Sequence, residues 1–265
     1  MKTIANQIRL LTMECISSIG QGHIGGSFSI VDVLTVLYFK QMNVDPNNPK
    51  MEARDRLVVS KGHAGPAVYA TLALKGFFDK KELLTLNRFG THLPSHCDMN
   101  KTPGVDMTAG SLGQGISCAC GLALGSKLKN DGAYIYAIIG DGESNEGQVW
   151  EAAQFAANYK LNNLIVFLDD NKLQLDGYTK DIMNPFDHAK KWESFGFYTQ
   201  RVNGHDYEAI DQAINNAKAQ KDAPSMIVLD TIKGYGVSFI ENAGASNHSM
   251  PITKEDIEKA KKELI

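Results

Sequence analysis

Residues 133–175 read AYIYAIIGDGESNEGQVWEAAQFAANYKLNNLIVFLDDNKLQL. An apolar run ending at Gly140 predicts a buried strand, the mixed segment after it predicts a helix, and a second apolar run ends at Asp170. These elements form a βαβ unit, whose parallel strands end at the same edge of a sheet. We therefore expect Asp141 and Asn171, thirty residues apart, to converge at that edge.

Asp141 and Asn171 bring two hard oxygen ligands to a glycine turn that precedes a helix. Such a place suits a divalent cation that holds a phosphorylated ligand, with a nearby backbone carbonyl as a third ligand. The simpler explanation for Asp141 is that it caps the following helix. The amide of Asn171 at the neighbouring strand end favours the metal site.

Outward from this unit, strands and helices alternate along the chain. Further strands are expected at 57–60, 197–202 and 226–230, and helices at 1–20, from 29 to 42, from 66, from 116, from 206 and at 253–265. Residues 43–56 and 76–103 are expected to be loops, the latter with one short helix, and 176–196 a polar excursion with one helix over the ligand edge. This order predicts an α/β fold with a doubly wound, mostly parallel sheet in one domain, 1–265.

Composition narrows the class of protein. With 265 residues, 43% of them hydrophobic, the chain can bury a substantial core, and its net charge of −3 gives no reason to expect nucleic acid or an anionic membrane as a partner. No apolar run approaches the ~18 residues of a membrane span. Polar residues interrupt the first twenty residues at helical spacing, unlike a signal peptide, so we expect a cytoplasmic protein.

The cysteines show no metal or disulfide pattern. The four are Cys15, Cys97, Cys118 and Cys120. Without a CxxC pair, neither a disulfide framework nor a zinc ribbon is expected. Cys118 and Cys120 lie in an apolar segment rich in Ala and Gly and are expected to be buried reduced thiols. A zinc site formed by His92, His96 and Cys97 is disfavoured because the fourth ligand is missing.

Glycine clusters at 62, 140–142 and 234–236 coincide with strand ends, and another opens the helix after 110. Tight turns explain any one of them, but together they surround one edge of the sheet. The spacing at 110–115 is GxxGxG, the reverse of the dinucleotide fingerprint, and no Walker pattern is present. A nicotinamide, flavin or P-loop site is therefore disfavoured.

Four of the seven histidines adjoin these glycine segments, namely His23, His63, His96 and His248. A neutral imidazole there could donate to a phosphate, move a proton or bind a hydroxylated substrate. Each one taken singly is better explained as a packing or surface residue, and His188 and His205 carry no functional signal.

These residues and their spacing resemble those of the transketolase family. Gly140-Asp141-Gly142 followed by Asn171 is similar to the thiamine diphosphate motif. Six blocks, beginning at residues 20, 60, 102, 140, 169 and 231, are similar to the family in its order: GQGHIGGSFS, SKGHAGPAVYA, TPGVDMTAGSLGQGIS, GDGESNEGQVWEAA, DDNKLQLDG and TIKGYGVSF. The resemblance implies the thiamine-diphosphate-binding fold of the diphosphate (PP-type) domain.

The resemblance also implies a role for each matching residue. The implied ligands of Mg²⁺, or of Ca²⁺ or Mn²⁺, are Asp141, the Asn171 side chain and the Leu173 carbonyl. The implied contacts of the cofactor are Lys61, His63, Gly142, Lys233 and His248 at the diphosphate, and Gly110, Ser111 and Leu112 under the rings. Asn171 belongs to both groups. His23, His96 and His248 would bind sugar hydroxyls and carry protons, and Glu146 would reach across a dimer interface towards the glutamate that activates the cofactor.

The implied reaction is ketol transfer, in which a two-carbon unit passes from a ketose phosphate to an aldose, as in the pentose phosphate pathway. Full-length members continue with a pyrimidine-binding domain and a third domain, whereas this chain ends with the first. It therefore resembles the N-terminal subunit of a split transketolase, and we expect a separately encoded C-terminal partner in a heterotetramer with two copies of each chain.

Two further interpretations remain open. One is a split transketolase specialised for an unusual sugar phosphate or a sulfosugar. The other is a catalytically silent regulatory subunit, against which the intact Asp141, Asn171, Glu146 and His63 argue. The neighbours of two histidines depart from the family, because Ser95 and Cys97 flank His96 in place of Gly and Pro, and Asn247 and Ser249 flank His248 in place of Trp or Val and Gly.

Overall fold

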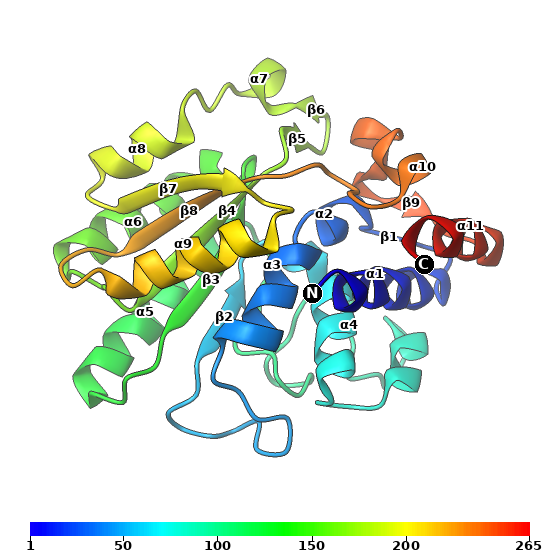
Figure 1. The fold of residues 1–265 in the computed structure, drawn as a ribbon, viewed down its shortest axis with the longest axis horizontal. Helices are drawn as coiled ribbons and strands as arrows, with labels where there is room; N and C mark the ends of the chain where they lie inside the picture. The colour runs from blue at the N-terminus through cyan, green and yellow to red at the C-terminus, as the bar shows by residue number, and fades with distance from the viewer.

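The computed structural model describes residues 1–265, and its centre is a five-stranded sheet (Figure 1). The strands are β2 (Arg56–Val59), β3 (Ile135–Gly140), β4 (Leu164–Asp170), β7 (Tyr198–Asn203) and β8 (Ser225–Asp230), in the spatial order β2-β3-β4-β8-β7. Every neighbouring pair is parallel. The predicted parallel sheet and its strands are confirmed.

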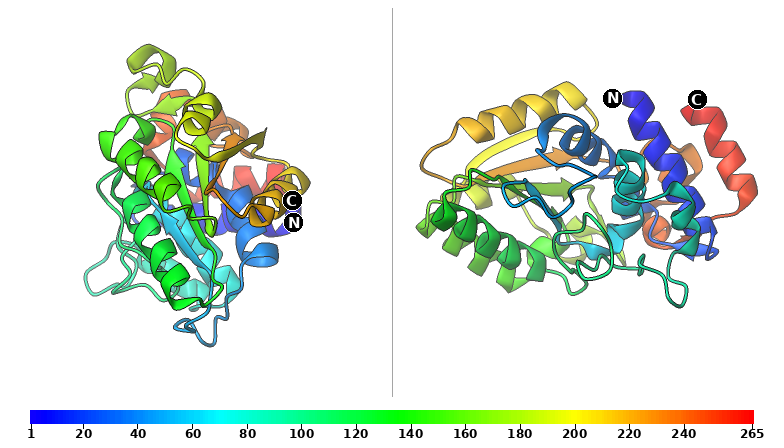
Figure 2. Two further views of the ribbon diagram at one scale, coloured as in Figure 1. Left: turned by 90° about the vertical axis from the view of Figure 1, so that its left-hand side faces the viewer. Right: turned by 90° about the horizontal axis from the view of Figure 1, so that it is seen from below.

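Helices cover both faces of this sheet (Figure 2). One face is covered by α3 (Val31–Val36), α4 (Gly65–Lys75) and α9 (Tyr207–Ala219), with α1 (Lys2–Ser17) packed against α3 and α4, and the other face by α5 (Gln114–Lys129), α6 (Gly147–Asn158) and α8 (His188–Ser194). Along β3, Tyr136 and Ile138 enter the first core while Ile135 and Ala137 enter the second. Burial on both faces explains why these strands read as continuous apolar runs.

The helix expected from 29 to 42 is present over residues 31–41, where α3 continues directly into a π-helical turn, η1 (Leu37–Gln41). A short helix that the sequence did not predict, α2 (Gly25–Phe28), lies in the glycine-rich residues just before it. Ile30 separates α2 from α3 because its φ of −103° and ψ of 1° are not helical.

The polar excursion at 176–196 holds two helices, where the sequence predicted one. A short helix, α7 (Thr179–Ile182), precedes α8. A four-residue helix is too short to produce a helical repeat in the sequence, so only α8, capped by Asp187, gave a signal. In Figure 1 this excursion extends above the edge of the sheet.

The remaining elements are short or peripheral. They are β1 (Gln21–Gly22) paired with β9 (Met250–Pro251), β5 (Leu173–Gln174) paired with β6 (Gly177–Tyr178), the 3₁₀ turns η2 (Gly62–Ala64), η3 (Lys80–Thr85), η4 (Glu143–Asn145) and η5 (Gly244–His248), α10 (Ser238–Glu241) and α11 (Lys254–Leu264). The N-terminal α1 and C-terminal α11 lie side by side, and the Asn6 side chain donates to the Leu264 carbonyl at 2.5 Å (Figure 2).

The four cysteines are free thiols, and the predicted burial is confirmed for Cys120 but not for Cys118. Cys15, Cys97 and Cys120 are buried free thiols, and Cys118 is a half-buried one. No group of three or more His, Cys, Asp or Glu side chains is arranged to hold a metal by itself. None of the helices has both the length and the apolar character of a membrane span.

Candidate functional site

The carboxyl ends of four strands meet around one cavity of about 410 Å³. Lys61 follows β2, Asp141 follows β3, Asn171 follows β4 and Lys233 follows β8. All four line the cavity, so the predicted convergence of Asp141 and Asn171 is found. The other predicted residues that line it are His63, Leu112, Gly142, Glu146, Leu173 and His248.

Asp141 is 3% exposed and is held by backbone donors. Its Oδ1 accepts from the Gly142 N–H at 2.7 Å and its Oδ2 from the Lys172 N–H at 2.6 Å. Burial, together with the nearby carboxylate of Asp169, raises the pKa of Asp141 to about 7. A buried carboxylate without a cationic partner is costly, and a bound cation would remove much of that cost.

The segment from Asn171 to Leu173 turns back towards Asp141. The Asn171 amide nitrogen donates to Asp169 Oδ2 at 2.8 Å, which fixes the orientation of the amide group. The amide oxygen accepts from the Leu173 N–H at 3.0 Å, and Lys172 between them has a left-handed φ of +67°. The turn presents an amide oxygen and a backbone carbonyl beside the Asp141 carboxylate.

These three oxygen donors fit a hard divalent cation. Three donors leave positions of an octahedral coordination sphere open, and only Asp141 among them carries a charge. Mg²⁺ commonly keeps one or two protein carboxylates and fills its other positions with phosphate oxygens and water. The donor set therefore fits a cation shared with a phosphorylated ligand.

Lys61 makes a buried ion pair with Asp169, a residue that the sequence analysis did not single out. Lys61 Nζ lies 2.6 Å from Asp169 Oδ2 and donates to the Gly26 carbonyl at 2.6 Å. Burial would raise the pKa of Asp169, but the Lys61 charge and hydrogen bonds from Ser29 and Thr231 outweigh it and lower this pKa. The Asp-Asp-Asn end of the strand carries the only sequence signal for Asp169.

Glu143 is a second functional candidate that sequence reasoning missed. It is buried in the cavity wall, and its carboxylate accepts from the Ser60 hydroxyl at 2.5 Å, the Gly113 N–H at 2.8 Å and the Gly140 N–H at 2.9 Å. It thereby joins the ends of β2 and β3 to the start of α5. Its place directly after the Gly-Asp-Gly turn could have drawn attention to it.

Lys233 brings a second buried ammonium group to the cavity. It is 3% exposed, and its Nζ lies 3.3 Å from both the Leu173 carbonyl oxygen and His248 Nδ1. Burial, together with the positive charge of Lys61, lowers the pKa of Lys233 to about 8. An anionic ligand between the two lysines would offset both charges.

Four predicted histidines form a cluster at the cavity. The His23 ring lies 5.4 Å from His63, 5.9 Å from His96 and 5.3 Å from His248, between ring centroids. His63 and His248 line the cavity, whereas His23 and His96 do not. Burial lowers the pKa of His23, His63 and His248, the last to about 4, so these imidazoles are neutral at pH 7.

The loop from Gly110 to Leu112 and Glu146 are exposed. Leu112 and Glu146 line the cavity, whereas Gly110 and Ser111 do not. From the excursion over the ligand edge, Met183 lines the cavity together with the preceding Gln174 and Leu175, as its predicted covering role requires. These contacts had no sequence motif.

The chain matches the family described as transketolase, thiamine diphosphate binding domain, over residues 1–265. It is 54% identical over 261 residues to the 6-deoxy-6-sulfo-D-fructose transketolase subunit SqwG of Clostridium sp. (strain MSTE9), covering 98% of this chain and 94% of the relative. It is 37% identical over 259 residues to an apulose-4-phosphate transketolase subunit of Phocaeicola vulgatus, covering 98% and 91%.

Among solved structures, the transketolase from Leishmania mexicana is similar with a TM-score of 0.92 and 33% identity. The similarity covers 99% of this chain and 41% of that one. The chain thus spans nearly all of the two subunits and less than half of the Leishmania protein.

Proposed function

The chain belongs to the transketolase family through its thiamine diphosphate binding domain, and on that premise we propose that it is the diphosphate-binding subunit of a two-chain transketolase. The observation that carries the proposal is the coverage of 94% and 91% of two relatives that are themselves named as subunits. The assembly transfers a two-carbon ketol unit from a ketose phosphate to an aldose, as in the pentose phosphate pathway.

The cation is held by Asp141, the Asn171 amide oxygen and the Leu173 carbonyl. Mg²⁺ suits this set, and Ca²⁺ or Mn²⁺ can replace it because all three accept oxygen ligands. The raised pKa of Asp141 supports the assignment, since a buried carboxylate next to Asp169 is stabilised by a positive charge.

Positive and neutral groups that line the cavity bind the diphosphate. Lys61 and Lys233 contribute charge, His63 and His248 contribute hydrogen bonds, and Gly142 lies beside them. Gly110, Ser111 and Leu112 lie under the cofactor rings. When bound, thiamine diphosphate supplies the electron sink that carbon–carbon bond cleavage requires.

The histidine cluster serves the sugar. Because His23 and His248 are neutral at pH 7, they can both donate to and accept from hydroxyl groups, and with His96 they can hold a proton during transfer. The apolar Leu175 and Met183 limit the access of water to the same cavity.

A C-terminal partner completes the reactive end of the cofactor, in a heterotetramer of two copies of each chain. The exposed Leu112 and Glu146 at the cavity mouth support this arrangement, because they reach the surface where a second chain would close the site. Glu146 then faces the partner's activating group.

A second candidate concerns the substrate. The 54% identity to a subunit named for 6-deoxy-6-sulfo-D-fructose, against 37% to one named for apulose 4-phosphate, favours a sulfosugar donor over an ordinary sugar phosphate. The paired complex should be assayed with sulfofructose, fructose 6-phosphate and xylulose 5-phosphate. Highest kcat/KM for either phosphate ester would reject the sulfosugar candidate.

Titration calorimetry tests the cofactor role. The chain, co-purified with a C-terminal transketolase chain encoded beside it, should bind thiamine diphosphate in a manner that requires a divalent cation. Absence of binding in the complex would instead support a catalytically silent regulatory subunit.

A further inference from the structure

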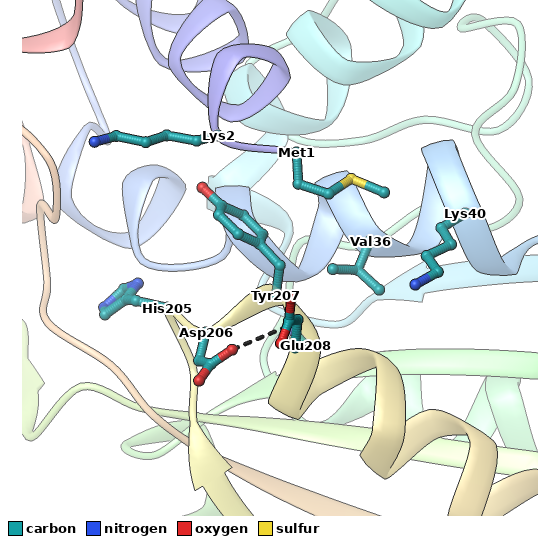
Figure 3. A pocket seen from close by; sticks show the side chains of 8 residues that line it. All are labelled: Met1, Lys2, Val36, Lys40, His205, Asp206, Tyr207 and Glu208. Carbon is teal, nitrogen blue, oxygen red and sulfur yellow. Dashed lines mark hydrogen bonds between the residues drawn. The ribbon is translucent and has the colours of Figure 1, made fainter.

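The loop Ile232–Gly236 follows β8 and carries Lys233 into the cavity. A separate hollow of about 630 Å³ lies at the start of α9 and is lined by none of the loop residues (Figure 3). His205 and Tyr207, which precede and begin α9, line this hollow and not the cofactor cavity. The contacts made by His205 point to a function that its sequence context did not reveal.

His205 holds the start of the loop directly. Its Nε2 accepts from the Ile232 N–H at 2.9 Å, and its ring stacks on Tyr235 with 3.5 Å between centroids and 14° between planes. The Ile232 N–H is one residue from Lys233. A change at His205 therefore reaches the backbone next to the ammonium group.

Arg9 on α1 holds the end of the same loop. Its Nε donates to the Tyr235 carbonyl at 2.9 Å. Gly236 has a left-handed φ of +101°, and a Cβ there would lie 2.8 Å from Arg9 Nε. The loop thus approaches the guanidinium group as closely as a glycine allows.

Both holding side chains are anchored on one fully buried carboxylate, Asp32 on α3. Its Oδ2 lies 2.6 Å from Arg9 Nη2 and 2.8 Å from His205 Nδ1, and its Oδ1 accepts from the Tyr207 hydroxyl at 2.9 Å. Because Asp32 accepts the Nδ1 proton, His205 Nε2 is left with a lone pair for the Ile232 N–H. One carboxylate thereby fixes the tautomer and both ends of the loop.

Burying the charged groups of Arg9 and Asp32 is costly, and apolar side chains could hold the same elements together equally well. Apolar side chains could not, however, make the hydrogen bonds that Arg9 and His205 make to the loop backbone. On the cavity side, the Gly234 N–H donates to the Gly25 carbonyl at 3.1 Å and Asn247 donates to the Lys233 carbonyl at 3.0 Å. Lys233 is therefore held between two sets of contacts.

We propose that His205, oriented by Asp32, is a positioning residue that fixes the Ile232–Gly236 loop and so places Lys233 for diphosphate binding. The inference rests on the proposed function of the cavity. His205 does not touch the ligand and acts through the Ile232 backbone.

Two variants separate the parts of the contact. His205→Phe keeps a ring to stack on Tyr235 but loses the acceptor, and His205→Gln keeps an acceptor but loses the ring. Tyr207→Phe is the matched control, because it removes a hydrogen bond to Asp32 without touching the loop. Circular dichroism and thermal unfolding establish that each variant is folded.

The first measurement is amide hydrogen exchange of residues 232–236 in the full chain without cofactor. His205→Phe should speed this exchange about tenfold, the loss expected for one hydrogen bond. His205→Gln should stay within about twofold of wild type because the oxygen replaces Nε2. Wild-type exchange in His205→Phe would overturn the proposal, as would equal acceleration in Tyr207→Phe.

The second measurement is calorimetry of thiamine diphosphate with Mg²⁺ in the paired complex. His205→Phe should weaken the Kd about tenfold in the wild-type background and have no effect in a Lys233→Met background. An equal loss in both backgrounds would mean that His205 does not act through Lys233. If the wild-type complex fails to bind thiamine diphosphate, the proposed function is wrong, and the exchange measurement still decides whether His205 holds the loop.

Discussion

The ammonium group of Lys61 and the carboxylate of Asp169 form an ion pair of 2.6 Å in which the two side chains are 3% and 0% exposed. The pair joins the turn after β2 to the end of β4, across the intervening β3. It therefore ties together the strand ends that form the cavity wall and leaves Asp169 able to orient the Asn171 amide.

Replacing Lys61 with Met should destabilise the chain by about 3–5 kcal/mol, because Asp169 would remain buried without its counter-charge. Urea unfolding measures the loss. The double variant Lys61→Met, Asp169→Asn should recover part of it, since the uncompensated charge is gone. Lys180→Met, which removes an exposed ion pair with Asp181, is the control and should change the free energy of unfolding by less than about 0.5 kcal/mol.

Asp141→Ala should abolish the cation-dependent part of thiamine diphosphate binding while leaving the fold intact. The variant loses the one charged ligand of the cation. It should still fold, because it also loses a buried negative charge that lies near the carboxylate of Asp169. Calorimetry with and without Mg²⁺ checks the first expectation and thermal unfolding the second. The exposed Asp176→Ala is the control. Unchanged cofactor affinity in Asp141→Ala would remove the metal assignment.

Asp32 should contribute a definite pH dependence of stability. Burial raises its pKa, but the His205 hydrogen bond and Arg9 outweigh burial, so the folded pKa lies below the unfolded one. The stabilisation is therefore present above the unfolded value of about 4 and is lost as pH falls through the folded pKa. Urea unfolding between about pH 5 and pH 2 should show a shallower pH dependence in Asp32→Asn. Identical pH dependence in the variant and wild type would contradict this attribution.

Gly25→Ala should weaken thiamine diphosphate binding by disturbing the loop that carries His248. A Cβ at Gly25 would lie 2.0 Å from the Asn247 side-chain oxygen and 2.8 Å from its carbonyl oxygen, so Asn247 must move. Since Asn247 also donates to the Lys233 carbonyl, the disturbance reaches both cofactor contacts. Gly125→Ala in α5, whose Cβ would meet nothing within 4 Å, is the control. Equal affinities in the two variants would show that the contact with Asn247 is dispensable.

Sequence reasoning located the cavity because the ends of buried strands can be recognised from hydrophobic patterning and from the glycine and polar residues that follow. Apolar runs that end in glycine and polar residues mark the carboxyl ends of buried parallel strands, and this pattern brought Asp141 and Asn171 together before any coordinates. The histidines stood out because they adjoin glycine segments, and the family resemblance added Lys61 and Lys233. The structure places each of them at or beside the cavity, and their individual roles stay predictions.

The residues that sequence reasoning missed act through long-range contacts. Asp169 and Glu143 matter because of partners such as Lys61 and Ser60, far away in the chain, and a single sequence does not show which donors surround a buried carboxylate. His205 was set aside for the same reason, since its partners Asp32 and Ile232 come from distant segments. The short α7 escaped because four residues produce no period.

The central claim is that this chain supplies only part of a thiamine-diphosphate-dependent ketol transferase. The most direct measurement is the rate of two-carbon transfer from a ketose donor to an aldose, by the chain reconstituted with its C-terminal partner and with each component omitted in turn. We predict transfer only when both chains, thiamine diphosphate and a divalent cation are present. Full transfer by this chain alone, or undiminished transfer by the pair without thiamine diphosphate, would contradict the account.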